Sequence, residues 1–175
     1  GSVVTHPDVL TNIEQILRPQ ILDQETLREM FELRLVIEVG MADFVFNRIT
    51  PEDLEALRAI VETEPPADAT AVFDSNFEVR FHGKLYEIAG NTTLQRVQTL
   101  LLPVFGYVHD RALLSAPQPE RPFVSHRGLV DILASGTPDT FRQAMRCHLD
   151  NHFHRAFENQ VTPAHAADEK VDDAG

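Results

Sequence analysis

Glutamate and histidine side chains lie on apolar helical faces at three places in the sequence. Glu78 and His82 are four residues apart in EVRFHGKLYEIAG, so on a helix they lie one above the other, on the face that also carries Phe81. His126 begins a second apolar stripe in SHRGLVDILA, and His148 lies in the middle of a third in FRQAMRCHLDNHF. Three helices therefore direct a histidine toward the core, and one of them directs a carboxylate there as well.

These four side chains are predicted to converge on one divalent metal ion. Burying an unpaired carboxylate is costly, and buried polar groups need partners. Neutral imidazoles and carboxylates are ligands of first-row metals, and the core of a helical bundle is where facing helices present them. Such a set would leave coordination positions for a further ligand on a six-coordinate ion. The spacing alone leaves open the alternative that each histidine is a hydrogen-bonded core residue.

Two other residues compete for places in this ligand set. His152 lies one turn after His148 in HLDNH, but the pair lacks the glutamate that follows the first histidine in zinc proteases. Asp74, two turns before His82, is a weaker alternative carboxylate. The only cysteine is Cys147, which excludes a disulfide framework or a cysteine-rich zinc site and favours a reducing, cytoplasmic setting.

Arg34 and Glu38 interrupt an apolar helical face and are four residues apart. One interpretation is a buried or half-buried ion pair. The other is that Arg34 reaches a cavity and binds an anionic ligand, because a guanidinium presents a planar fork of donors that matches a carboxylate. The same helix is apolar on a second side, so it is either fully surrounded or part of a subunit interface. That side carries Leu33, Val36, Ile37, Gly40 and Phe44.

Helices must position these residues, because the dominant period of the sequence is helical and no stretch alternates like a strand. The chain has 175 residues, of which 43% are hydrophobic, enough for the core of one domain. Start signals such as Thr-Pro-Glu-Asp and stop signals such as Gly-Asn define the elements. The expected fold is an all-α antiparallel bundle of six or seven helices. We expect them at about 7–17, 24–47, 51 to before 65, 69–90, 92–114 (bent or broken by Pro103 and Gly106), 123–134 and 138–159.

Charge and the chain ends limit the possible functions. Lys and Arg number 15 and Asp and Glu number 27, for a net charge of −12, which argues against this segment binding a phosphate backbone. No apolar run is long enough for a membrane span, and no signal peptide opens the chain. Gly1-Ser2 resembles the scar that a protease leaves in an expressed protein. We expect residues 1–23 to be a linker with a short helix and residues 160–175 to be a disordered tail.

Three segments resemble the C-terminal effector-binding (FCD) domain of GntR-family transcription regulators of the FadR subfamily. They are LREMFELRLVIEVGMADF, FEVRFHGKLYEIAGN and SHRGLVDILASGTPDTFRQAMRCHL. The resemblance extends from about Gln24 to Phe157 and places the domain at residues 24–159. Its most specific part is an acid four residues before the histidine of Phe-His, then an asparagine, then two later histidines.

The resemblance implies a helical antiparallel bundle, usually dimeric, in which one acid and three histidines hold a divalent ion beneath a pocket. Residue by residue, the implied ligands are Glu78, His82, His126 and His148, which favours His148 over His152. Zinc is the expected metal, with nickel, manganese or iron as alternatives, because imidazole and carboxylate suit all of them. The family usually has Asp where this chain has Glu78, so the longer side chain could shift the metal or hold it more weakly.

The resemblance also implies a function. The family's effectors are small organic acids, often carboxylates, and Arg34 matches a basic position on the first long helix of the domain. An acid that binds at the metal and pairs with Arg34 would tighten the bundle and move the DNA-binding modules of a homodimer. Those modules are N-terminal winged helices that would precede Val3, so DNA is contacted only through them. The alternative is a small metal-dependent enzyme, for which His152 and Asp74 are the only candidate general bases.

Overall fold

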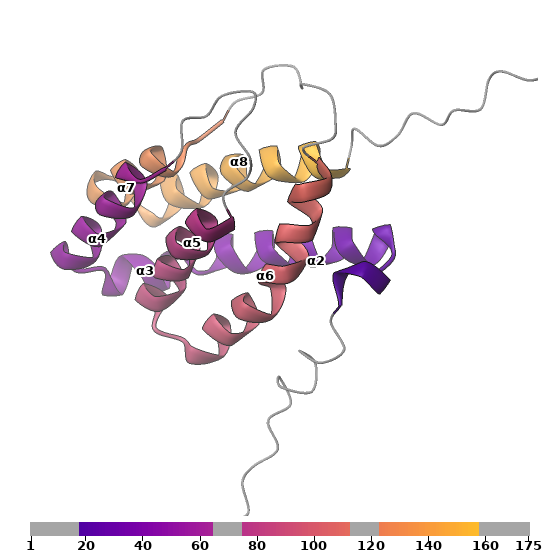
Figure 1. Ribbon diagram of the computed structural model, residues 1–175. Helices are drawn as coiled ribbons and strands as arrows, with labels where there is room; N and C mark the ends of the chain where they lie inside the picture. The colour runs from indigo at the N-terminus through magenta and orange to yellow at the C-terminus, as the bar shows by residue number, and fades with distance from the viewer. Residues whose placement is uncertain (1–17, 65–74, 113–122, 158–175) are drawn as a thin grey trace, which may run out of the picture.

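The computed structural model describes residues 18–64, 75–112 and 123–157. These residues form seven α-helices and one short 3-10 helix, and the described part of the chain contains no β-strand. The prediction of an all-α helical bundle is confirmed (Figure 1). In chain order the elements are η1 (Pro19–Ile21), α2 (Gln24–Gly40), α3 (Ala42–Arg48), α4 (Pro51–Glu62), α5 (Ser75–Ala89), α6 (Thr92–Ala112), α7 (His126–Ser135) and α8 (Pro138–Phe157).

Local capping signals explain where several helices begin and end. Thr50 and Asp53 form a reciprocal capping box at the start of α4, which satisfies two backbone N–H groups that have no partner within the helix. Gly90 follows the end of α5 with a φ of 65°, a left-handed conformation that favours glycine. The next residue, Asn91, accepts hydrogen bonds from the backbone N–H groups of Thr93 and Leu94 at 3.0 and 3.1 Å. These boundaries match the predicted ones.

The expected long helix over residues 24–47 is two helices, α2 and α3, and in this respect the prediction was wrong. Met41 lies between them with φ −83° and ψ 0°, outside the helical region. Its N–H still bonds to Ile37 O, and its own carbonyl accepts from Val45 N, both at 3.0 Å. The hydrogen-bond ladder therefore continues through the bend, directly after Gly40, a residue with low helix propensity.

Two other boundaries differ from the expectation. The helix over 92–112 is continuous through Pro103, so of the two predicted effects, a bend or a break, the break is absent, although a proline removes one backbone donor there. Helix α7 begins at His126 and not at Phe123, because the side chain of Ser125 accepts from the N–H of Gly128 and caps the first turn. The predicted helix over 7–17, the predicted start of a helix at 69–74 and the predicted tail at 160–175 lie outside the described residues.

The bundle has two apolar clusters, and charged residues lie between them along α2. Helix α2 contacts α8 and α6, whereas α5 contacts α6, α3 and α4. Leu27 and Phe31 belong to one cluster, and Met41 and Val45 belong to the other. Between these pairs along the chain are Arg34 and Glu38, with exposed fractions of 4% and 1%. No helix in the described ranges has the length and the apolar character that crossing a bilayer requires.

Candidate metal centre

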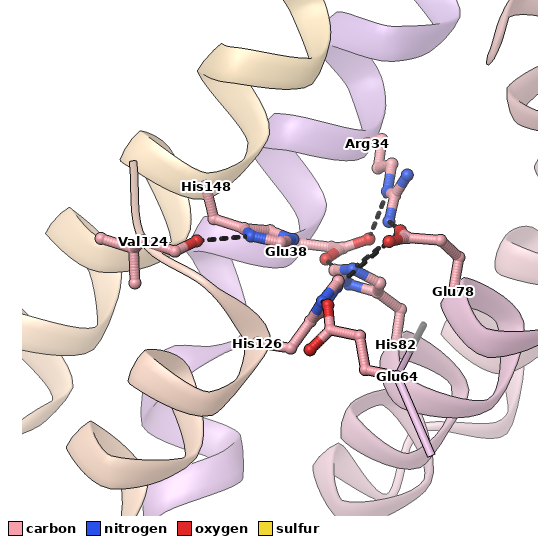
Figure 2. A network of polar contacts seen from close by, with 8 residues as sticks. All are labelled: Arg34, Glu38, Glu64, Glu78, His82, Val124, His126 and His148. Atoms are coloured by element: carbon pink, nitrogen blue, oxygen red, sulfur yellow. Dashed lines mark hydrogen bonds and ion pairs between the residues drawn. The ribbon is translucent and has the colours of Figure 1, made fainter. Parts of the chain in front are cut away.

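The four predicted ligands lie together in the interior of the bundle (Figure 2). Glu78 and His82 come from successive turns of α5, His126 is the first residue of α7, and His148 lies near the middle of α8. Each residue offers one ligand atom, and these atoms all lie within 4.8 Å of one another. All four side chains are buried. The three apolar stripes that the sequence showed on separate helices therefore meet at one point.

The Glu78 carboxylate lies in front of the imidazole nitrogens. Its Oε1 is 3.1 Å from Nε2 of His126, and its Oε2 is 3.3 Å from Nε2 of His82. Both nitrogens are buried, and neither meets the geometry of a hydrogen bond with any described residue. A nitrogen that is removed from water needs a partner, and a shared cation would provide one for both.

In each imidazole the second ring nitrogen, Nδ1, lies within hydrogen-bonding distance of an oxygen atom. Nδ1 of His82 lies 2.6 Å from Glu38 Oε2, and Nδ1 of His126 lies 2.6 Å from Glu64 Oε1. Nδ1 of His148 lies 2.8 Å from the carbonyl of Val124. Because these oxygens can only accept, we assign the Nδ1–H tautomer to each neutral ring, which places the lone pair on Nε2. Outer acceptors of this kind are typical of histidines that bind metals.

The electrostatics of the metal-free site favour a cation. Burial by itself raises the pKa of Glu38, but its electrostatic interactions and hydrogen bonds with His82 and Arg34 hold this pKa at about 2. Burial, together with the neighbouring His126 and His82, lowers the pKa of His148 to about 3, so this ring is neutral. Burial also disfavours charge on His126, yet the carboxylates of Glu64 and Glu78 raise its pKa to about 9.

A count of formal charges supports the same conclusion. Three carboxylates face the cluster, from Glu38, Glu64 and Glu78, and Arg34 supplies one guanidinium. With neutral imidazoles, the form that binds a metal, this arrangement carries two net negative charges; without a metal, the proton on His126 compensates one of them. Unpaired charge is costly in a buried site, and a divalent cation would neutralise it. The residues present therefore fit the ion that the sequence predicted.

Arg34 both forms a buried ion pair and lines a pocket. Its Nε donates to Glu38 Oε1 at 2.7 Å, and its Nη2 donates to Glu78 Oε2 at 3.4 Å. The guanidinium carbon lies 4.7 Å from the centroid of the Phe105 ring, a distance that allows a cation–π contact. The adjoining pocket has about 320 Å³ of empty space, part of which is open solvent, and is lined by Arg34, Glu38, Glu78, Val79, His82, Gln98, Leu102, Phe105 and Gly106.

Sequence reasoning missed the residues that orient the histidines. Glu38 was recognised only as a partner of Arg34, although its place on an apolar face was a signal that it is buried. Glu64 carried no signal, because it follows α4 and lies 62 residues before His126. The competing residue Asp74 lies outside the described part of the chain, and so does the side chain of His152, although its backbone belongs to α8.

Comparisons with known proteins agree with this architecture. The FCD domain family model matches residues 29–151. The chain is 24% identical over 148 residues to the HTH-type transcriptional regulator LutR of Bacillus subtilis (strain 168), an alignment that covers 81% of this chain and 68% of the relative. No solved structure matches the chain. The chain therefore belongs to the FCD domain family, the C-terminal effector-binding domain of GntR-type transcription regulators, and is not an enzyme.

Proposed function

We propose that this domain senses a small carboxylate at a divalent metal ion and transmits its binding to the DNA-binding modules of a dimer. The observation that carries the proposal is the arrangement of the three imidazoles. Each has an acceptor on Nδ1, and a ligand atom of each lies within 4.8 Å of a Glu78 carboxylate oxygen and of the others. Donors that are oriented in this way before binding lower the cost of forming a site.

Glu78, His82, His126 and His148 would hold the ion, with zinc as the first expectation and nickel, manganese or iron as alternatives. When bound, the ion supplies a positive charge that attracts an anionic effector. Glu78 is longer by one methylene than the aspartate usual in the family, and its carboxylate nevertheless reaches the nitrogens of His82 and His126 across the core. The extra length therefore does not remove the carboxylate from the ligand cluster.

Arg34 would bind the carboxylate of the effector. Together with Glu78 and His82 it lines the pocket of about 320 Å³, so an acid in this pocket lies beside both the guanidinium and the ligand cluster. Part of this space is open solvent, so the enclosed part of the pocket is much smaller, which favours a small acid. An arriving carboxylate would compete with Glu38 and Glu78 for Arg34 and so change the contact between α2 and α5.

The proposal includes a homodimer formed through the second apolar side of α2. The sequence left two interpretations of this side, and the second is supported by its exposure among the described residues. Val36 is 70% exposed, Phe44 is 50% exposed and Leu33 is 41% exposed. An exposed apolar stripe of this kind is typical of an interface, and a second copy of the chain is the occupant we propose. DNA would be bound by N-terminal modules of the cytoplasmic regulator.

Metal content tests the ligand assignment directly. We expect the purified chain to contain about one divalent ion per protomer by elemental analysis, and His82→Ala and His126→Ala to lower that content and weaken acid binding. Glu32→Gln is a matched control, because Glu32 lies on α2 with its side chain 52% exposed. Full metal stoichiometry in both histidine variants would contradict the assignment. Treatment with EDTA should also lower the melting temperature, because an ion that binds only the folded state stabilises it.

A further inference from the structure

We infer that Gln98 determines which acids the pocket accepts, by donating a hydrogen bond to a second oxygen atom of the effector. The inference rests on the proposed acid-sensing function and adds a specificity residue and a chemical class to it. The preferred ligand is a small carboxylate that also bears a hydroxyl or carbonyl oxygen. Arg34 would bind the carboxylate, and the Gln98 amide would bind the other oxygen.

The amide nitrogen of Gln98 is a buried donor that lacks a partner. Gln98 lies on α6 with an exposed fraction of 7%, and its Nε2 has no hydrogen-bond partner among the described residues. An amide that is removed from water without a hydrogen bond is unfavourable, and a ligand atom that accepts from it recovers the loss. Buried groups of this kind in a cavity wall are how binding sites reject analogues that lack one polar atom.

Gln98 lines the pocket, and its amide lies against the backbone of α5. Gln98, Leu102 and Phe105 share one face of α6, at helical spacing, and all three line the pocket. On the neighbouring helix α5, a Cβ at Gly83 would lie 3.7 Å from both the Nε2 and the Oε1 of Gln98. Since this is an ordinary van der Waals distance, the absence of a side chain at Gly83 leaves the amide beside the backbone of α5.

The composition of the wall determines what kind of ligand oxygen is recognised. Among the described residues that line the pocket, Gln98 alone has a side-chain amide, and Val79, Leu102 and Phe105 are apolar. An N–H donor requires an acceptor, so an acid whose remainder is purely hydrocarbon leaves this group unsatisfied. A hydroxyl or carbonyl oxygen accepts from the Gln98 Nε2 donor without adding a charge, whereas an ammonium group cannot accept a hydrogen bond from it.

Pairs of acids that differ by one oxygen test this inference on the zinc-loaded full chain. Calorimetry would compare glycolate with acetate, and 2-hydroxybutanoate with butanoate, in carboxylate-free buffer. The wild-type protein is expected to bind each hydroxy acid at least about tenfold more tightly than its partner. In Gln98→Leu the ratio is expected to fall close to one, with the affinity for acetate and butanoate changed by less than about threefold.

Stability and a second variant separate recognition from a structural role. Leucine in place of Gln98 removes the unpaired Nε2 donor and keeps most of the side-chain volume. Without ligand, Gln98→Leu is therefore expected to melt at or above the wild-type temperature. Gln98→Asn keeps the amide but draws it back by one methylene, and it should reduce the preference for hydroxy acids in the same direction. Zinc content should be unchanged in both variants.

The possible failures are distinguishable. If the zinc-loaded wild type binds the acids without preference, or if Gln98→Leu keeps the wild-type ratio, the role of Gln98 is wrong and the acid-sensing function stands. If none of the four acids binds to zinc-loaded protein, this class of effector is wrong and the inference is overturned with it. If the wild type binds no zinc, the proposed metal site itself is wrong.

Discussion

Glu38 accepts a hydrogen bond from Nδ1 of His82 at 2.6 Å, within a fully buried pair. The other oxygen of the same carboxylate accepts from Nε of Arg34 at 2.7 Å. One side chain of α2 therefore joins the predicted effector-binding guanidinium to a predicted metal ligand on α5 (Figure 2). Through Glu38, a change at Arg34 has a direct physical route to the metal site.

Replacing Glu38 by glutamine should weaken metal binding without removing a ligand. The amide has nearly the same shape, but it loses the charge that orients His82 and strengthens its Nε2 as a donor to the ion. We expect an affinity loss of about 10–100-fold, measured by competition with a chelating dye. Glu32→Gln on the exposed side of α2 provides the control. An unchanged metal affinity for Glu38→Gln would show that the hydrogen bond to His82 does not tune the site.

Arg34→Ala should separate acid binding from metal binding. The variant removes the donors for the effector carboxylate, so the affinity for acids should fall at least about tenfold, while metal content remains. It also leaves Glu38 and Glu78 without their buried cation, so we expect the free energy of unfolding to decrease by about 3 kcal/mol. Calorimetry with acids and chemical denaturation would measure the two effects.

Arg28→Ala is the matched control for this experiment. Arg28 lies on the same helix and pairs with Glu32 at 3.2 Å, but its side chain is 57% exposed. An exposed pair of this kind contributes no more than about 1 kcal/mol, and the control should leave acid binding unchanged. If acid affinity is the same in Arg34→Ala and in wild type, Arg34 does not bind the effector.

Metal binding should strengthen with rising pH and release a proton. Metal ligation requires a neutral His126, and the carboxylates of Glu64 and Glu78 raise the pKa of this ring to about 9 in the metal-free protein. A proton therefore competes with the ion below pH 9, and the affinity should fall by up to about tenfold per pH unit from this group. Calorimetry in buffers of different ionisation enthalpy would measure the released protons. Affinity that is constant between pH 6 and 9 would contradict this assignment.

Val36→Glu should dissociate the dimer. Val36 is 70% exposed on the second apolar side of α2, and a twofold interface would bury the new charge in both copies. We expect the dimer dissociation constant to rise at least about tenfold, measured by sedimentation equilibrium. Ile21→Glu is the control, because Ile21 is 72% exposed but lies outside α2, in η1, which contacts α6. Equal dissociation constants for Val36→Glu and wild type would exclude this side of α2 as the interface.

Sequence predictions of helix boundaries were confirmed where a few neighbouring residues cap the helix. Thr50 and Asp53 form the expected cap, and the left-handed Gly90 lies where the chain leaves α5. They were less accurate where weak local signals had to be weighed. Met41 separates α2 from α3 directly after Gly40, and α6 passes Pro103 without a break. Packing against other helices can override such helix propensities.

The sequence by itself determined that the fold is helical and that Glu78, His82, His126 and His148 face the core, because helical periodicity assigns each side chain to one side of its own helix. It also determined that Arg34 and Glu38 lie on a buried face, four residues apart. Only the tertiary structure decided that the four core-facing residues meet at one point, that Glu38 and Glu64 orient two of the histidines, and that Gln98 borders the same pocket. Those relationships depend on how separate helices cross, and periodicity along one helix carries no information about that.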